Sequence, residues 1–162
     1  MPDTDPILAP FGDAAKKSAF RDNVRYTVPA EKLFDVMSAL KAGGFDFLVD
    51  VTAVDYLHYP NATDRYGVVY ALANTETAAR VYVKVMLNDP DPVVKSVYPL
   101  WKGADWMERE VYDMFGILFD GHPDLRRILM PEGFESYPLR KDYPLRGRGE
   151  RHNFETVTRA EG

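Results

Sequence analysis

The sequence predicts an α+β domain, with a mainly antiparallel sheet, helices on one face of that sheet, and an extended, proline-punctuated C-terminal segment. Residues 30–44 carry apolar side chains at helical spacing, and four other segments are rich in β-branched and aromatic residues. Three of those four follow one another with connections too short for a crossover helix, which favours antiparallel hairpins. From residue 123 onward prolines recur every six to eight residues and regular patterns cease, which indicates an extended segment.

The composition limits the classes of function. The 162 residues suffice for one domain with a core, and the net charge of −5 argues against a nucleic-acid-binding module, because such modules are usually basic. The chain contains no cysteine, so it has no disulfide framework, no thiolate nucleophile and no thiolate ligands for an iron–sulfur cluster. A redox centre of that kind must therefore belong to another chain.

The α+β domain is expected to begin with a strand and a helix. Residues 23–28 are predicted to form the first strand, and Pro29 then presets the backbone for the first turn of a helix. Gly43 or Gly44 ends this helix, which spans residues 30–44. The apolar stripe that faces the core consists of Leu33, Phe34, Met37 and Leu40.

Three strands are predicted next, at residues 45–57, 65–74 and 79–87, separated by polar turns or turns that contain Gly or Asn. The first half of the third strand alternates between apolar and polar residues, as expected of a half-buried antiparallel strand. The order strand–helix–strand–strand–strand is typical of a sheet with one face covered by helices.

Two further helices are expected before the regular patterns end. In the first, Asp91 is the candidate N-cap, Pro92 occupies the first helical position and Pro99 ends the helix. The side chains that would face inward are those of Val93, Val94 and Val97. The second helix is expected within residues 104–116.

The chain is therefore expected to have three parts. Residues 1–20 lack the basic start and apolar block of a secretory signal and are expected to form a flexible leader. Residues 21–116 form the α+β domain. Residues 117–162 form an extended partner-docking segment, which is too apolar for a solvated tail and therefore lies on a surface. No apolar run in the chain approaches the roughly 18 residues needed to span a bilayer.

Three carboxylates lie close together in the helix expected within residues 104–116. Asp105 and Glu108 have the spacing of an N-cap residue and its capping-box acid, which would satisfy free N–H groups at the helix start. Glu110 and Asp113, three residues apart, lie on another common face. The cluster is therefore expected to divide into one cap and one pair.

Arginines are the expected partners of Glu110 and Asp113. Arg109 lies on the same side of the helix, and Arg126 and Arg127 follow shortly after it in the chain. Guanidinium groups bind carboxylates directly, and a buried carboxylate left unpaired would cost several kcal/mol. The expected role of these pairs is to hold the start of the C-terminal segment against the helix.

A metal site is the alternative interpretation. Glu110 and Asp113, with His122 as a third ligand, would suit a metal-dependent hydrolase that binds a divalent cation through oxygen ligands. The three histidines, His58, His122 and His152, have no zinc-like spacing, so each is expected to be a surface or hydrogen-bonded histidine. Ion pairing is favoured over metal binding because the arginines compete for the same oxygens.

The stretch between Arg126 and Arg151 is basic, with seven Lys or Arg against four Asp or Glu, a local charge of +3. It is a solvated tail, a patch that steers an acidic partner surface, or part of an RNA-binding module. The tetrapeptide Tyr-Pro-Leu-Arg occurs within it twice, at residues 137–140 and 143–146. In an extended ribbon this spacing of six residues would present the same face of both copies.

One pattern joins the carboxylate helix to this stretch: Glu-Arg-Glu, two residues, an acid, two apolar residues and Gly, then His-Pro, then Arg before an apolar pair. Together with the later Pro-Leu-Arg-Lys-Asp-Tyr block, it resembles the signature of the thirty-kilodalton subunit of respiratory complex I. That family comprises the C-type subunit of bacterial NADH:quinone oxidoreductase and the J-type subunit of cyanobacterial and plastid relatives. The residues that carry the resemblance are Glu108, Arg109, Glu110, Asp113, Phe115, Gly116, His122, Pro123, Arg126, Arg127, Ile128, Leu129, Pro138, Leu139, Arg140, Lys141, Asp142 and Tyr143.

The resemblance implies a subunit of the peripheral arm of a proton-translocating NADH:quinone oxidoreductase. It implies assembly with the forty-nine-kilodalton (D-type) chain and with neighbouring iron–sulfur subunits, which would carry the FMN and the iron–sulfur clusters. It implies no catalytic, cofactor-binding or metal-binding residue on this chain, and no nucleic acid partner. The expected location is the cytoplasmic face of the bacterial inner membrane, reached only through the complex. The signature residues are expected at the interface with the partner.

Overall fold

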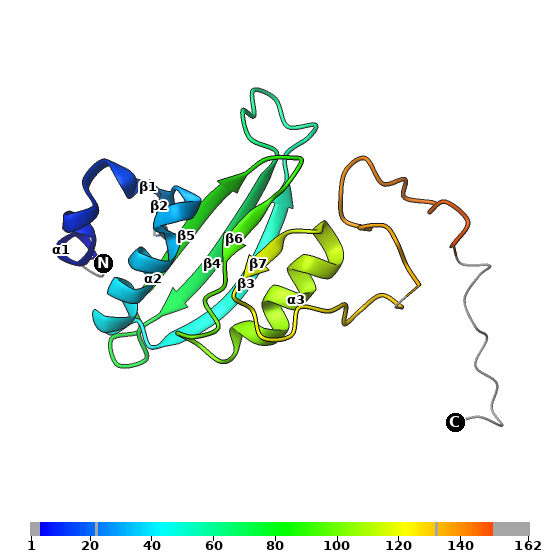
Figure 1. Cartoon of the computed structure of the whole chain (residues 1–162). Coiled ribbons are helices and arrows are strands. Elements are labelled where there is room, and N and C mark those ends of the chain that lie inside the picture. The colour runs from blue at the N-terminus through cyan, green and yellow to red at the C-terminus, as the bar shows by residue number, and fades with distance from the viewer. Residues whose placement is uncertain (1–3, 22, 132, 151–162) are drawn as a thin grey trace.

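A computed structural model describes residues 4–21, 23–131 and 133–150. Its main element is a five-stranded sheet whose neighbouring strands are, in order, β1 (Lys16–Phe20), β2 (Asn23–Val28), β5 (Arg80–Leu87), β4 (Tyr66–Ala73) and β3 (Phe47–Asp55). Two helices, α2 (Leu33–Ala42) and α3 (Ala104–Phe115), lie on one face of this sheet, in front of it in Figure 1.

The predicted α+β fold with a mainly antiparallel sheet is confirmed. β3, β4 and β5 form an antiparallel meander, as their short connections indicated. β2 pairs with β5 in parallel, because α2 carries the chain over the sheet before the meander begins. The expected helix at residues 30–44 begins as a short 3-10 turn, η2 (Ala30–Lys32), continues as α2 and has Gly43 at its C-cap.

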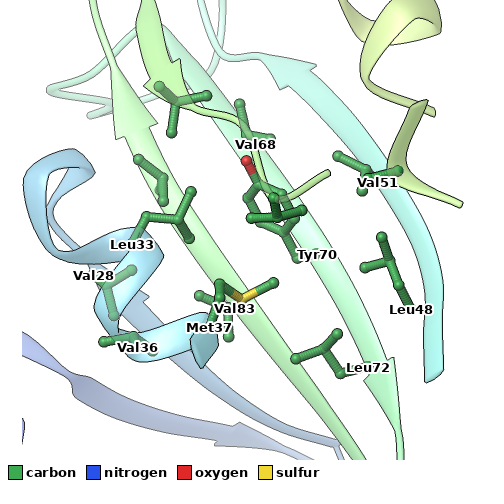
Figure 2. Packing of buried hydrophobic residues seen from close by; sticks show 14 of the residues in the cluster. Val28, Leu33, Val36, Met37, Leu48, Val51, Val68, Tyr70, Leu72 and Val83 are labelled. Carbon is green, nitrogen blue, oxygen red and sulfur yellow. The ribbon is translucent and has the colours of Figure 1, made fainter. Parts of the chain in front are cut away.

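Alternation along the strands places one face of the sheet against the helices. In β5, Val81, Val83 and Val85 are fully buried, whereas the residues between them are only half-buried. Figure 2 shows the side chains of α2 packed over those of the central strands, and the labelled members of this core are Val28, Leu33, Val36, Met37, Leu48, Val51, Val68, Tyr70, Leu72 and Val83.

Residues 4–20, the described part of the expected flexible leader, form regular elements instead. They contain a short helix, α1 (Asp5–Leu8), a 3-10 segment, η1 (Ala9–Ala14), and the edge strand β1. β1 pairs with β2 in an antiparallel register that matches Lys16 with Thr27. All five residues of β1 are exposed, so the strand lacks the apolar alternation by which the other strands were predicted.

The prediction of a short helix that begins at Pro92 is wrong. The chain instead forms β6 (Val93–Lys95), which pairs in parallel with β7 (Leu118–Asp120) in a separate two-stranded sheet. The local signals of a helix start were present, but β-branched residues suit a strand, and β7, distant in sequence, supplies the hydrogen-bonding partner. This pairing brings the chain that follows α3 back beside the chain that precedes it.

The C-terminal segment, residues 117–150 in the described part of the chain, is not the extended ribbon that the Tyr-Pro-Leu-Arg repeat indicated. Its second half is a series of turns, in which the N–H of Arg140 donates to Tyr137, that of Tyr143 to Arg140 and that of Gly147 to Pro144. Proline favours the second position of such turns, where Pro138 lies. In the part of the chain described here, no helix has the length and hydropathy to cross a membrane.

Candidate partner-docking site

Asp113 of α3 is the centre of the contacts that hold the C-terminal segment. Its Oδ1 accepts a hydrogen bond from Arg127 Nη1 at 2.7 Å, and its Oδ2 accepts the backbone N–H groups of Ile128, Leu129 and Met130 at 3.1, 2.7 and 2.8 Å. The residue is fully buried. One carboxylate therefore fixes four consecutive residues of the segment, and the expected ion pair of Asp113 with an arginine is formed by Arg127.

These donors also set the charge state of Asp113. Burial by itself would raise the pKa of its carboxyl, but the hydrogen bonds from Met130, Leu129, Arg127 and Ile128 outweigh burial and hold the pKa below its usual value. The ionised form is therefore the one that the surrounding residues stabilise.

Arg109 forms a second connection from α3 to the same segment. Its Nε donates to the carbonyl of Arg126 at 3.1 Å and its Nη2 to that of Arg127 at 3.4 Å, while its guanidinium lies 4.9 Å from the centre of the Trp106 ring. The side chain of Arg126 is exposed and pairs with Asp124. Arg109 therefore binds the backbone of the segment rather than a carboxylate.

Glu108 does not cap α3. The N-cap is Gly103, and among the described residues no side chain caps the helix start. Glu108 is fully buried, and its two carboxyl oxygens accept hydrogen bonds from Ser96 Oγ at 2.5 Å and from the N–H of Val97 at 2.7 Å. The capping-box prediction is therefore wrong, because Glu108 points into the domain and ties α3 to the chain that follows β6.

Burial raises the pKa of Glu108 to about 7, against the opposing effect of its hydrogen bonds to Ser96 and Val97. The negative charge of the nearby Asp105 contributes to this rise. Glu108 and Asp113 are thus two buried acids of one helix whose surroundings favour opposite charge states, because Asp113 accepts three backbone N–H groups and a guanidinium, whereas Glu108 accepts one N–H and one hydroxyl.

His122 connects the residues after β7 to the start of α3. Its Nδ1 accepts the N–H of Asp124 at 3.1 Å, which places the ring proton on Nε2, and Nε2 lies 3.2 Å from the carbonyl oxygen of Asp105. Nε2 is also 4.0 Å from Glu108 Oε2, and the side chain is fully buried. His122 is therefore a hydrogen-bonded histidine, one of the two roles predicted for it; His58 is exposed, and His152 lies outside the described residues.

Gly116 allows the segment to approach the end of α3. Its φ of +72° lies in the left-handed region, and a Cβ at this position would be 2.5 Å from the Tyr137 ring and 2.7 Å from Arg140 Nη2. Arg140 Nε donates to the carbonyl of Phe115 at 2.5 Å, and its guanidinium lies 4.6 Å from the centre of the Tyr137 ring. Arg140 therefore accounts for one of the carbonyls that α3 leaves unpaired at its end.

A second buried carboxylate, which the sequence reasoning missed, holds the segment further along. Asp55, at the end of β3, accepts the N–H of Lys141 at 2.8 Å and lies 3.3 Å from Arg65 Nη2. The same guanidinium pairs with Asp142 at 2.8 Å and with Asp89 at 2.6 Å. Burial alone would raise the pKa of Asp55, but the hydrogen bonds from Lys141, Leu57 and Arg65 outweigh burial and lower it.

A signal for Asp55 was present in the sequence. Val51, Ala53 and Asp55 share the same parity in β3, so an acid occupies a position that faces the core. A buried acid requires a partner, so this pattern predicts a cation from a distant part of the chain. The sequence offered no comparable signal for Arg65, which precedes β4.

Glu110 does not share the surroundings of Asp113. It is exposed, and it forms no ion pair with any residue that the structure describes. Three residues separate the two acids by about 60° around the helix, and the boundary of the buried face falls between them. The predicted pairing of Glu110 with an arginine is therefore wrong.

Three leucines of the C-terminal segment are exposed among its charged residues. Leu129, Leu139 and Leu145 are 59%, 50% and 104% exposed. Leu139 shows the contrast most clearly, because its N–H donates to the carbonyl of Met114 at 3.1 Å while half of the residue remains exposed. The remaining signature residues are Pro123, which is exposed, and Pro138 and Tyr143, which are half-buried.

The expected metal ligands are not brought together. In residues 4–21, 23–131 and 133–150 no group of three His, Cys, Asp or Glu side chains is arranged to hold a metal ion. The oxygens of Asp113 already accept four hydrogen bonds, and Glu110 faces solvent. The geometry thus gives the metal-dependent hydrolase no support, and what it builds is a segment held by buried carboxylates with leucines facing outward.

The chain is similar in sequence to known proteins of one family. The family described as "Respiratory-chain NADH dehydrogenase, 30 Kd subunit" matches residues 26–149. NADH-quinone oxidoreductase subunit 5 of Thermus thermophilus is 46% identical over 129 residues, which cover 76% of this chain and 62% of that protein. The C-type subunit of NADH-quinone oxidoreductase from Sinorhizobium medicae is 52% identical over 126 residues, which cover 75% of this chain and 60% of that protein. The chain thus spans about three fifths of the length of these curated relatives.

Two solved structures are also similar. The trypsin-resistant fragment (1–134) of Nqo5 has a TM-score of 0.68 and 36% identity, and the match covers 75% of this chain and 95% of that one. A chain of the membrane-bound sulfane sulfur reductase, an archaeal respiratory membrane complex, has a TM-score of 0.77 and 25% identity, and the match covers 96% of this chain and 91% of that one. The second match extends over nearly the whole chain.

Proposed function

Because the chain belongs to the family of the thirty-kilodalton subunit of respiratory-chain NADH dehydrogenase, we propose that it is a non-catalytic subunit of the peripheral arm of a proton-translocating NADH:quinone oxidoreductase. It supports electron transfer from NADH to quinone by assembling with the forty-nine-kilodalton (D-type) chain through its C-terminal segment. FMN and the iron–sulfur clusters belong to partner subunits, and the chain reaches the cytoplasmic face of the bacterial inner membrane only through the complex.

The observation that carries this proposal is the two-sided character of the C-terminal segment. Its inner side is bound by Asp113 and Asp55, and its outer side presents Leu129, Leu139 and Leu145. Ordering a segment that has little regular structure costs conformational entropy, and exposed leucines in such a segment recover none of that cost until a partner covers them. The segment is therefore preorganised for docking.

Point substitutions on the outer side test the docking. The double variant Leu139→Asp/Leu145→Asp leaves the bonds to Asp113 and Asp55 intact and introduces charge into the docking surface. We expect co-purification of the D-type chain to fall about tenfold, because desolvating an unpaired carboxylate at an interface costs more than about 1 kcal/mol. Quantitative mass spectrometry of the purified complex measures this loss.

Leu57→Asp is the matched control, because Leu57 is 42% exposed and lies in the connection between β3 and β4. It should leave the amount of co-purified partner unchanged. If the double variant co-purifies as much D-type chain as the native protein does, and the melting temperature of the isolated chain is unchanged, the docking proposal is wrong. Point variants are sharper than truncation at Gly121, which would remove Arg127 and leave Asp113 without its partner.

A further inference from the structure

The face of the five-stranded sheet that points away from α2 and α3 is a second surface, distinct from the C-terminal segment. We call it the open face. Ser18, Arg25, Tyr82, Ala71 and Asp50 are successive Cα partners across all five strands, and together they form one row of this face. On the edge strand β3, Phe47 and Val54 are 53% and 39% exposed. The open face therefore exposes apolar side chains beside polar ones.

The charge of the open face is opposite to that of the chain. Lys16, Arg25, Arg80 and Lys84 lie at its positions, against the single acid Asp50, which gives a net charge of +3 on a chain of −5. Within the described residues, none of these four cations forms an ion pair. The fold thus gathers uncompensated positive charge on one side of an acidic protein.

A shallow hollow of about 250 Å³ lies in this face. Its lining combines three aromatic rings, Phe20, Tyr56 and Tyr82, with the cations Arg25 and Lys84, and none of the described lining residues is an acid. Lys84 Nζ donates to Tyr56 Oη at 2.9 Å, and Arg25 Nε donates to Ser18 Oγ at 3.1 Å. Both cations are thus held at the hollow by neutral hydrogen-bond partners, so their positive charge can pair with an acidic group of a ligand.

A second hollow borders Lys16 at one edge of the same face, and it differs in charge. Asp13 and Asp64 contribute to its lining together with Lys16. The uncompensated charge is therefore concentrated around Arg25 and Lys84. Aromatic residues with arginine are the combination that is enriched at protein–protein interfaces.

We infer that the open face binds a segment of a partner protein in which carboxylates alternate with apolar side chains. The carboxylates pair with Arg25 and Lys84, and the apolar side chains cover Phe20 and Tyr82. Two copies of this chain would bring like charges together if they met through this face. The net charge of −5 repels an extended polyanion such as RNA or an anionic lipid surface, whereas a short acidic segment meets only the local +3.

Site-specific photo-crosslinking in cells that make the full chain tests this inference. A benzophenone-bearing phenylalanine replaces Asn23, which lines the hollow, and, as a control, Trp106, which is 63% exposed on α3 at the other face of the sheet. Crosslinked peptides are identified by mass spectrometry. The expected product at residue 23 joins this chain to a protein segment that carries at least two carboxylates, and the product at residue 106 does not contain that segment.

Charge reversal completes the test. Arg25→Glu/Lys84→Glu should lower the yield of the residue-23 product about tenfold, and Lys32→Glu, which changes an exposed cation outside the open face, should not change it. A Lys84→Met variant, which keeps the apolar stem, separates loss of charge from loss of packing against Tyr56. Products with RNA, lipid, a second copy or a segment without carboxylates, or no product at all, would each overturn the inference. The inference does not require the partner to be the D-type chain. It can therefore fail while association through Leu139 and Leu145 holds, and it can hold while that association fails.

Discussion

Three acids of α3 share a short stretch of sequence and have three different surroundings. Asp113 is buried with one guanidinium and three N–H donors, Glu108 is buried with a hydroxyl and one N–H, and Glu110 is exposed. The number and charge of the donors decide the state of each buried acid. Hydrogen bonds from Met130, Leu129, Arg127 and Ile128 together outweigh burial and lower the pKa of Asp113, whereas the two hydrogen bonds to Glu108 do not outweigh burial, so its pKa is raised.

Glu108 therefore makes stability depend on pH. Because its pKa of about 7 in the folded protein exceeds the ordinary 4.5, its contribution is fully present below pH 4.5 and is lost as the pH rises through 7. Relative to Glu108→Gln, which mimics the protonated form, the native protein should lose on the order of 3 kcal/mol of unfolding free energy across this interval. Urea unfolding at a series of pH values measures the difference, with Glu110→Gln as the control, and parallel curves for the native protein and Glu108→Gln would contradict it.

At the scale of elements, the end of α3 determines how the C-terminal segment returns to the domain. The helix ends at Gly116, whose left-handed backbone turns the chain into β7, and the later turn at Tyr137 packs where a side chain of residue 116 would lie. The pairing of β6 with β7 then holds both sides of α3 together. Local patterns predicted α3 itself, but not these returns, because both depend on residues distant in sequence.

Gly116→Ala tests this close approach. Adopting the left-handed conformation costs alanine about 1 kcal/mol, and the new Cβ must also displace the Tyr137 ring and Arg140. Gly121→Ala is the matched control, because φ there is +82° but nothing lies within 4 Å of the added Cβ. Urea unfolding should therefore place Gly116→Ala clearly below Gly121→Ala in stability. Equal losses would mean that the segment does not pack against Gly116 in solution.

At the scale of the whole molecule, two buried carboxylates from different elements join the C-terminal segment to the α+β domain. Asp113 reaches it from α3 and Asp55 from the end of β3, and Figure 1 shows the segment leaving α3 and running beyond the sheet. Each carboxylate binds backbone N–H groups of the segment. These hydrogen bonds therefore depend on the course of the backbone more than on the side chains of the bound residues. This course of the backbone leaves the leucines exposed to solvent.

Asp113→Ala should release the segment. Removing one partner of a buried ion pair leaves Arg127 without its partner and three N–H groups without an acceptor, which should cost about 3 kcal/mol of unfolding free energy. In cells, we expect less assembled complex but an unchanged NADH:quinone turnover per assembled complex. Blue-native electrophoresis with an activity assay measures both quantities.

Glu110→Ala, on the same helix, is the control for that experiment. Because Glu110 is exposed and has no ion pair in the described part of the chain, this substitution should change neither the amount of complex nor its turnover. Loss of turnover at a normal amount of assembled complex in Asp113→Ala would instead place Asp113 in the catalytic machinery.

Local sequence patterns were enough to predict the α+β class, the antiparallel meander and the positions of α2 and α3. These follow from the periods of apolar residues and from the lengths of connections, which are local properties. The sequence also identified Asp113 as a residue that requires an arginine, since an acid beside apolar residues must be paired. The family resemblance rests on the same stretch, because its signature is a run of residues in sequence.

The remaining features depend on contacts between segments that are distant in sequence. The strand at Val93 exists because β7 lies beside it, and Glu108 is buried because Ser96 and Val97 supply its donors. Asp55 meets Lys141 across 86 positions of the chain, a separation that no local pattern encodes. The open face likewise gathers cations from separate strands. In each case, burial and pairing depend on which distant segments fold together, whereas periodicity depends only on neighbours in sequence.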